Sequence, residues 1–185
     1  MNDEYGKIDS AGDTYVCSNF QLENGYILPQ VEVRYNSYGQ MNKERDNVLV
    51  VCHALTGNSR LDQWWSDMLG PNKAFDTNKY YVLCANALGS CYGTTGPTSI
   101  NPLTNKPYGI TFPEVTIRDT VALHLQMVRE GMQVKSVCGV VGGSMGGMHT
   151  LEWGLLAGDY VKSIVVIACN MYHSAWQVRE RERER

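Results

Sequence analysis

A glycine-rich hexapeptide, 142–147 (GGSMGG), constrains the fold of this chain more than any other segment. It contains the pattern G-x-S-x-G, follows the β-branched apolar run 137–141 and precedes the helix-compatible stretch 148–156. In that setting the pattern predicts a nucleophile elbow, a strained turn from a strand into a helix that presents a serine hydroxyl above a sheet. Glycines are needed around the serine because strand and helix pass too close for side chains. We therefore expect Ser144 to be a nucleophile, with a purely structural glycine turn as the alternative.

Length, composition and charge limit the classes of protein to which the chain can belong. Its 185 residues suffice for one domain with a hydrophobic core, and 43% of them are hydrophobic, which indicates a globular protein. No apolar run approaches the ~20 residues that a membrane-spanning helix needs. The polar, acidic segment 1–13 resembles neither a secretory signal nor a transit peptide, so we expect a cytoplasmic protein. A net charge of −3 without a basic stripe argues against nucleic acid as a partner.

The cysteines show neither a C-x-x-C pair nor the spacing of metal ligands. Most of them lie in or at the ends of expected strands, so we interpret them as buried, reduced thiols and expect neither disulfides nor a metal site. A catalytic cysteine is the minor alternative, and Cys91 in a glycine-rich loop is its most plausible position. The six cysteines are Cys17, Cys52, Cys84, Cys91, Cys138 and Cys169.

The apolar pattern along the chain predicts an α/β fold. Alternating apolar positions indicate two half-exposed antiparallel strands at the start, and continuous apolar runs indicate strands buried on both faces. The clearest helix begins at Thr116, which forms a capping-box-like pair with Asp119, and ends at Gly131. The strand–helix–strand order predicts a mostly parallel sheet with helices on both faces. The expected strands are 15–20, 31–38, 48–51, 80–85, 137–141 and 164–167, and the expected helices are 116–130 and 145–156.

A serine nucleophile also needs two N–H donors for the oxyanion that forms when it attacks a carbonyl. In folds with this elbow, one donor is the residue after the nucleophile, and the other lies in the loop after an earlier strand. Met145 is the first donor. The second lies in the segment 53–57, which leaves a buried strand at the carboxyl edge of the sheet, where ligands bind. Leu55 is the best candidate and Thr56 the next.

The base that would activate Ser144 is harder to find, because the chain has four histidines. His149 lies on the helix after the elbow, about 500° of rotation beyond the serine, so we expect it to face away. We expect His124 on the surface or at the rim of the site. His53 is more plausibly a structural hydrogen-bonding residue than a base. His173 follows the last strand and stays a weak candidate.

The acid of a catalytic triad is also missing from the expected place. In this fold the chain order is serine, acid, histidine, so both partners should follow Ser144. Asp159 precedes the last strand and so lies at the wrong end of the sheet, and Asn170 stands where some folds of this type place an acid. The alternating run of arginine and glutamate in 178–185 has no apolar face to bury, and we interpret it as a solvated tail. The triad is therefore expected to be incomplete.

Several segments in unbroken order resemble one protein family. The most specific are HALTG at 53–57, GTTGP at 93–97 and GGSMGGM at 142–148, within a likeness that covers about residues 15–177. Together they resemble the homoserine O-acetyltransferases, an acetyl-CoA-dependent branch of the α/β-hydrolase fold. The related serine O-acyltransferases and deacetylcephalosporin C acetyltransferases share much of this pattern, so the acceptor is less constrained than the chemistry.

The resemblance implies an acyltransferase of methionine biosynthesis. An acetyl group would pass from acetyl-CoA to Ser144 and then to the hydroxyl of L-homoserine in a ping-pong reaction without a bound cofactor. The family carries its lid, its catalytic Asp and His and its dimer interface in a C-terminal part, where this chain has the arginine–glutamate run. We expect an inactive or poorly folding fragment with exposed sheet edges. The segments are an N-terminal tail (1–13), an α/β-hydrolase domain incomplete at its C-terminus (14–177) and a charged tail (178–185).

Two alternatives to this reading are open. A serine hydrolase or esterase would share the elbow but admit water to the acyl-enzyme. A remnant without enzymatic activity, kept as an interaction module, is the other. The long matching segments outside the elbow favour the acyltransferase.

Overall fold

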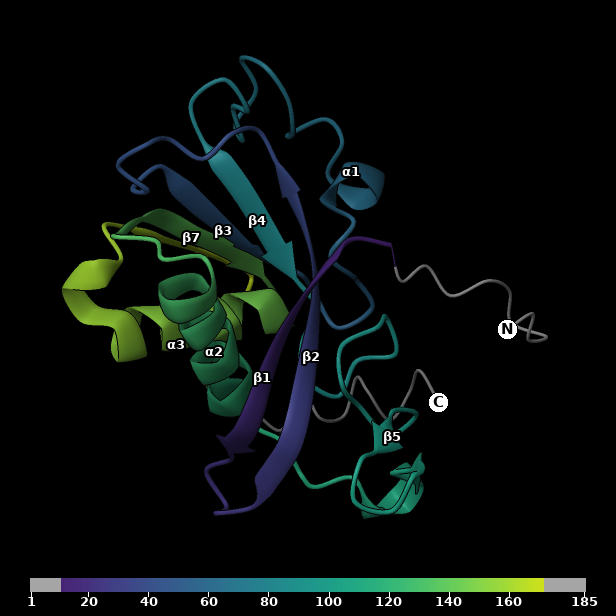
Figure 1. Ribbon diagram of the computed structural model, residues 1–185. Coiled ribbons are helices and arrows are strands. Elements are labelled where there is room, and N and C mark those ends of the chain that lie inside the picture. The colour runs from purple at the N-terminus through teal and green to yellow at the C-terminus, as the bar shows by residue number, and fades with distance from the viewer. Residues whose placement is uncertain (1–10, 172–185) are drawn as a thin grey trace.

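Residues 11–171 are described by the computed structural model, and they form a six-stranded sheet with helices packed against it (Figure 1). The strand order is β1-β2-β4-β3-β7-β8. The pairs β1–β2 and β2–β4 are antiparallel, whereas β4, β3, β7 and β8 run parallel, so the expected mostly parallel sheet is confirmed. The strands are β1 (Asp13–Gln21), β2 (Ile27–Tyr38), β3 (Val48–Cys52), β4 (Tyr81–Ala85), β7 (Val137–Gly143) and β8 (Ile164–Ile167).

The burial of the central strand follows its sequence pattern, whereas the edge strand β8 is mostly exposed despite its continuous apolar run. All five residues of β3 are buried, as its continuous apolar run predicts for a central strand. Strand β2 buries Val31 and Val33 at alternate positions. In β1 the buried residues Cys17 and Phe20 are three apart, because Asn19 between them, at φ 55°, has no paired residue. Both strands are longer than expected, and β1 begins at Asp13, within the segment expected to be a tail. The rest of that segment, up to residue 10, and the charged tail 178–185 lie outside the described residues.

Two helices cover one face of the sheet. These are α2 (Ile117–Gln126), continued by a π-helical turn, η2 (Met127–Gly131), and α3 (Met145–Ala157) (Figure 1). The expected capping box is present at the start of α2, because Asp119 N–H donates to Thr116 Oγ1 at 3.0 Å and Thr116 N–H donates to the Asp119 carboxylate at 2.9 Å. The helical segment therefore begins and ends where the sequence predicts.

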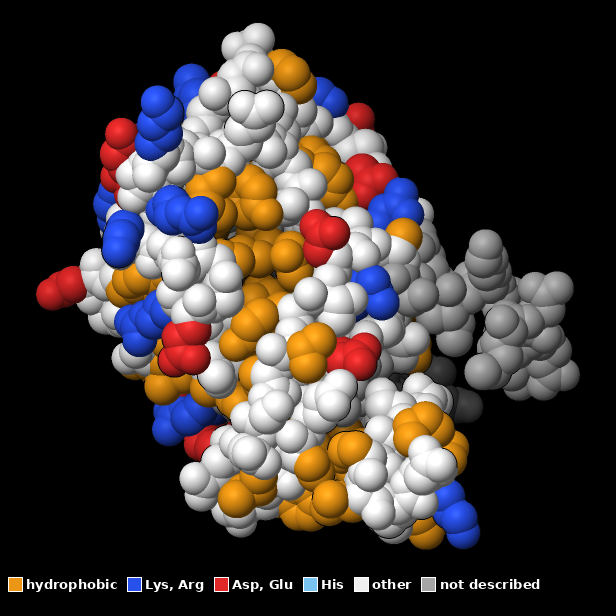
Figure 2. Space-filling model, in the orientation of Figure 1, with side chains coloured by type: hydrophobic (Ala, Val, Ile, Leu, Met, Phe, Trp, Pro, Cys, Tyr) orange, Lys and Arg blue, Asp and Glu red, His pale blue; other side chains and the backbone are white. Residues whose placement is uncertain are grey.

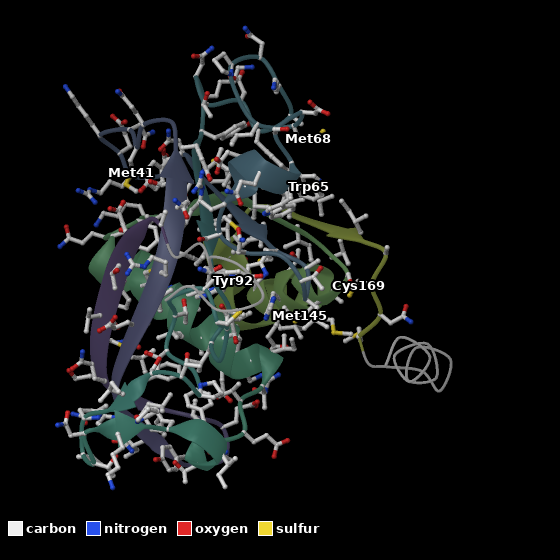
Figure 3. All side chains as sticks on the ribbon, turned by 90° about the vertical axis from the view of Figure 1, so that its right-hand side faces the viewer. Met41, Trp65, Met68, Tyr92, Met145 and Cys169 are labelled. Carbon is white, nitrogen blue, oxygen red and sulfur yellow. The ribbon has the colours of Figure 1, made fainter. Side chains whose placement is uncertain are left out.

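The other face of the sheet carries less structure. Its only helix within the described residues is the single turn α1 (Leu61–Trp64), followed by an aromatic cluster of Trp64, Trp65 and Phe75. Beside this cluster an apolar groove of about 370 Å³ runs along the sheet, and Trp65 lies near β8 (Figure 3). The exposed apolar surface expected from the sequence is therefore present. The side chains that line the groove include Leu49, Trp65, Met68, Phe75, Val141, Val165 and Ile167.

The long segment between β4 and α2 is irregular, as expected. It contains only a small hairpin of β5 (Ile100–Asn101) and β6 (Lys106–Pro107) and the 3₁₀ turn η1 (Gly109–Thr111).

None of the helices within residues 11–171 is long and apolar enough to cross a membrane. On the face shown in Figure 2, Lys and Arg side chains are interspersed with Asp and Glu rather than gathered into a basic patch.

Candidate active site

Ser144 occupies the sharp turn between β7 and α3. Its backbone angles are φ 57° and ψ −125°, a combination that a residue with a side chain adopts at a cost of about 1–3 kcal/mol. Ser144 N–H donates to the Ile167 carbonyl of β8 at 3.1 Å, and Gly147 N–H donates to the Ser144 carbonyl at 2.9 Å. The residue is exposed to solvent. The predicted elbow geometry is therefore present, with the serine at its tip.

The glycines of the elbow are required by close backbone contacts. A Cβ on Gly142 would lie 2.2 Å from the Gly146 carbonyl oxygen, and a Cβ on Gly146 would lie 2.1 Å from the Cys52 carbonyl oxygen. A Cβ on Gly147 would lie 2.5 Å from that of Cys169, so the segment after β8 packs on the first turn of α3; Figure 3 shows Met145 and Cys169 at this end of the sheet. The start of α3 is thus pressed against the end of β3.

This contact brings the chain that leaves β3 to the elbow. Cys52, the last residue of β3, pairs with Gly142 of β7. The following residues form a turn in which Gly57 N–H donates to the Ala54 carbonyl at 2.9 Å. Leu55 and Thr56 are the exposed central residues of this turn, and no backbone carbonyl of the described residues accepts from their N–H groups.

Met145 supplies the other predicted donor position. It is the first residue of α3, and the first N–H groups of a helix have no acceptor within the helix and lie at the positive end of its dipole. No backbone carbonyl of residues 11–171 therefore accepts from the N–H groups of Met145, Leu55 and Thr56. An oxyanion needs N–H donors of this kind, and the assignment of Met145 and Leu55 as its two donors stays a prediction.

His53 is held by two hydrogen bonds and is not a free base. Its Nδ1 lies 2.8 Å from the Ala54 carbonyl, which can only accept, so Nδ1 carries the proton. Its Nε2 accepts from Ala87 N–H at 3.2 Å, which uses the remaining lone pair. Burial lowers the pKa of His53, and the ring stays neutral. The sequence-based reading of His53 as a structural residue agrees with this geometry.

The expectation that His124 lies on the surface or at the rim is wrong. His124 is 6% exposed, and its Nε2 donates to the Asn86 carbonyl at 3.0 Å. This carbonyl satisfies the imidazole, which is why a polar residue can occupy the buried face of α2. His149 is also buried, and both line a small cavity with Cys52 and His53. Burial lowers the pKa of His124 to about 4 and that of His149 to about 3.

No base or acid stands at the elbow within residues 11–171. The three histidines there, His53, His124 and His149, are each less than 9% exposed, whereas Ser144 is exposed. Asp159 lies in the 3₁₀ turn η3 (Gly158–Tyr160) before β8, at the amino end of the parallel strands, as expected. The remaining candidate, His173, lies outside the described residues.

Sequence reasoning missed the polar hub at Asn86, which directly follows β4. The Asn86 side chain is 1% exposed; it accepts from Ser59 N–H at 2.7 Å and donates to the Tyr92 carbonyl at 2.8 Å. Its own carbonyl accepts from His124. One residue thus ties the chain after the 54–57 turn to the glycine-rich loop and to α2. An asparagine directly after a buried strand was the available signal.

The structure gives less support to a catalytic cysteine or a metal site. Cys91 is exposed in the glycine-rich loop, and the structure gives it no catalytic partner among the described residues. Within the same residues, no group of three or more His, Cys, Asp or Glu side chains could hold a metal ion. Ser144 is therefore the candidate nucleophile that the geometry favours.

Comparison with known proteins shows to which family the chain belongs. The model of the alpha/beta hydrolase fold matches residues 47–183, most of the chain. The chain belongs to the α/β-hydrolase fold family. It is 51% identical over 166 residues to the homoserine O-acetyltransferase of Nostoc punctiforme, an alignment that covers 90% of this chain and 46% of that protein. It is 46% identical over 169 residues to the homoserine O-acetyltransferase of Methanococcoides burtonii, covering 86% of this chain and 34% of that protein.

Solved structures are similar over the same region of this α/β-hydrolase chain. The homoserine O-acetyltransferase from Bacillus anthracis is 30% identical with a TM-score of 0.75, covering 82% of this chain and 44% of that one. A crystal structure of esterase E22 is 31% identical with a TM-score of 0.80, covering 92% of this chain and 50% of that one. The resemblance to homoserine O-acetyltransferases that the motifs predict is confirmed. The chain spans about half the length of curated relatives such as the Nostoc punctiforme protein.

Proposed function

We propose that this chain is the nucleophile-bearing part of a homoserine O-acetyltransferase, an acyltransferase that moves acetyl from acetyl-CoA to the hydroxyl of L-homoserine in methionine biosynthesis. The single observation that carries the proposal is Ser144 at the tip of a strained elbow, in a chain 51% identical to a homoserine O-acetyltransferase. Acetyl-CoA and L-homoserine are substrates, no resident cofactor is required, and the reaction is placed in the cytoplasm.

The chemistry proceeds in two transfers. The Ser144 hydroxyl oxygen attacks the thioester carbonyl carbon, and the N–H groups of Met145 and Leu55 stabilise the oxyanion. The C–S bond then breaks, the CoA sulfur leaves as the thiol with the serine proton, and acetyl stays on Ser144 as an ester. In the second transfer the homoserine hydroxyl attacks this ester, O-acetylhomoserine leaves, and the proton returns to Ser144. Each transfer needs a base that shuttles the proton.

The described residues do not provide that base, so we propose that they do not complete the reaction alone. His53 has both ring nitrogens engaged, and His124 and His149 are buried. In α/β-hydrolases the acid and the histidine follow the serine in the chain. The relatives are about twice as long as this chain, which supports placing both groups in the part that it does not span. The expected consequence is slow or absent turnover.

Mass spectrometry of Ser144 tests the proposal. The protein is incubated with acetyl-CoA, and the peptide that contains Ser144 is examined for an acetyl group, with the Ser144→Ala variant as control. Acetyl on the wild-type peptide and release of O-acetylhomoserine after homoserine is added support the acyltransferase. Absence of acetyl on Ser144 even after addition of a polypeptide carrying the remaining part of a relative would contradict it and favour a non-enzymatic remnant.

An esterase is the second candidate, because the esterase structure is as similar to this chain as the solved homoserine O-acetyltransferase is. The two functions differ in the fate of the acyl group. An esterase passes acetyl from Ser144 to water at the same rate with or without homoserine. A transferase passes it faster when homoserine is present, so the dependence on homoserine separates them.

A further inference from the structure

We infer that His53 is a positioning residue that aims the Leu55 N–H at the oxyanion by holding the carbonyl of Ala54. The inference rests on the proposed function, in which Leu55 is a donor, and it assigns a reason for the histidine at the start of the 53–57 segment. His53 does not touch the reacting atoms. It acts through one peptide group.

The Ala54 carbonyl and the Leu55 N–H belong to the same peptide unit. A peptide unit is planar and, in the trans form, its C=O and N–H point in opposite directions. Every peptide bond of the described residues is trans. Whatever fixes the direction of the Ala54 carbonyl therefore fixes the direction of the Leu55 N–H. A rotated peptide would turn a carbonyl oxygen, rather than a donor, toward the elbow.

Two donors converge on the Ala54 carbonyl. Gly57 N–H donates to it at 2.9 Å across the turn, and His53 Nδ1–H donates to it at 2.8 Å. The turn packs tightly on the histidine, because a Cβ on Gly57 would lie 3.2 Å from both the His53 Cβ and the Ala54 oxygen. Both hydrogen bonds draw the carbonyl to the inner side of the turn, so the Leu55 N–H points to the opposite side.

The His53 ring is itself held from the neighbouring strand. Its Nε2 accepts from the N–H of Ala87, which follows β4, at 3.2 Å, and the residue is 3% exposed. A neutral imidazole that accepts a hydrogen bond at one nitrogen carries its proton on the other. The Ala87 hydrogen bond thus selects the tautomer that can donate to Ala54. The direction of the Leu55 N–H is linked through His53 to the end of β4.

Two substitutions separate the two hydrogen bonds. In His53→Asn the side-chain amide N–H lies near the position of Nδ1 and can still donate to the Ala54 carbonyl. In His53→Gln the side-chain carbonyl lies near the position of Nε2 and can still accept from Ala87 N–H, but the donor to Ala54 is lost. The control is His124→Gln, which alters a second buried histidine of the same cavity that has no hydrogen bond to the turn.

The first readout does not depend on activity. In NMR spectra of the full chain, the wild-type His53 ring is expected to carry its proton on Nδ1. The amide protons of Leu55 and Gly57 are expected to keep their shifts in His53→Asn and His124→Gln, and to shift in His53→Gln. The Gly57 amide, which donates to the Ala54 carbonyl, is expected to exchange at least about tenfold faster in His53→Gln than in the wild type. A proton on Nε2, or unchanged amides in His53→Gln, would overturn the inference.

The second readout is the rate at which p-nitrophenyl acetate acetylates Ser144. Loss of one oxyanion donor slows acyl transfer about 10²–10³-fold, so His53→Gln is expected to lose a factor of this order, and His53→Asn and His124→Gln less than about tenfold. Equal losses in both His53 variants would overturn the positioning role, because a merely structural residue affects both alike. If wild-type Ser144 is not acetylated even after addition of a polypeptide carrying the remaining part of a relative, the proposed function fails, and the amide shifts alone decide whether His53 fixes the turn.

Discussion

The carbonyl oxygen of Cys52 occupies the space where residue 146 would carry a side chain. A Cβ at Gly146 would lie 2.1 Å from this oxygen. The contact joins the end of β3 to the first turn of α3, and so joins the 54–57 turn to the elbow. Any residue larger than glycine at 146 has to separate these two segments.

Gly146→Ala is therefore expected to destabilise the protein by about 3 kcal/mol, the upper end of the usual cost of overpacking. The neighbouring Gly143→Ala is the control, because the nearest atom to a Cβ there is the Ile167 carbonyl oxygen at 3.7 Å, which is an ordinary contact. That variant should stay within about 0.5 kcal/mol of the wild type. Urea denaturation followed by circular dichroism measures both. Equal losses would show that the close approach at Gly146 is not the cause.

The buried histidines predict that stability falls as the pH falls below neutrality. In the folded protein burial lowers the pKa of His124 to about 4 and that of His149 to about 3, from an ordinary value of 6.5. Above pH 6.5 both are neutral in the folded and unfolded chain. Below it the unfolded chain binds protons that the folded chain does not, which costs up to about 1.4 kcal/mol per pH unit and histidine.

Between pH 7 and pH 5 the free energy of unfolding is accordingly expected to drop by about 2–4 kcal/mol, measured by urea denaturation at each pH. The hydrogen bond with Arg60 lowers the pKa of Asp62 to about 2, from an ordinary value of 3.8. The stability that the ionised Asp62 contributes is therefore lost only below about pH 3.8, outside the range from pH 7 to pH 5. His124→Gln should reduce the slope. A slope that is unchanged by this substitution would contradict the assignment to His124.

The Asn86 hub predicts a difference between two substitutions. Asn86→Asp keeps an oxygen that accepts from Ser59 N–H, whereas Asn86→Ala removes this acceptor and leaves a buried N–H without a partner, at about 1–3 kcal/mol. Both variants lose the donor to the Tyr92 carbonyl. Hydrogen exchange of the Ser59 amide is the measurement. It should stay slow in Asn86→Asp and become fast in Asn86→Ala; similar rates in both would argue against the hub.

The apolar groove predicts concentration-dependent self-association. Val165 of β8 is 50% exposed and lines the groove with Trp65 and Met68. Val16 of β1 is also 50% exposed, but it does not line the groove and serves as the control position. Exposed contiguous apolar surface favours association more than a single exposed residue does. Light scattering should show less association for Val165→Lys than for Val16→Lys. The reverse order would show that the chains do not associate through the groove.

Features set by local sequence were predictable. The elbow at Ser144 follows from glycines at fixed spacing between a strand and a helix pattern, and the start of α2 follows from Thr116 and Asp119 alone. The continuous run at β3 indicated a strand with two buried faces. In each case the physical cause lies within a few residues, so the pattern carries the information.

Features that depend on distant polar partners were not predictable. His124 is buried because its Nε2 finds the carbonyl of Asn86, which lies 38 residues earlier in the chain. Its position on the helix gave no sign of that partner, so the expectation of a surface histidine failed. The role of Asn86 was missed for the same reason, since its hydrogen bonds join three separate segments. The spacing of apolar residues predicts which face of an element is buried, but it does not predict which buried polar atoms form hydrogen bonds with each other.

The hydrogen bond from Ser144 N–H to the Ile167 carbonyl sets an order of events during synthesis. The residues of the elbow leave the ribosome before those of β8, and the acceptor for the serine amide does not yet exist when the glycine-rich turn emerges. The turn can take its final form once β8 has added to the edge of β7. Among the strands that the structure describes, β8 is the last to be made, and the reactive geometry depends on it.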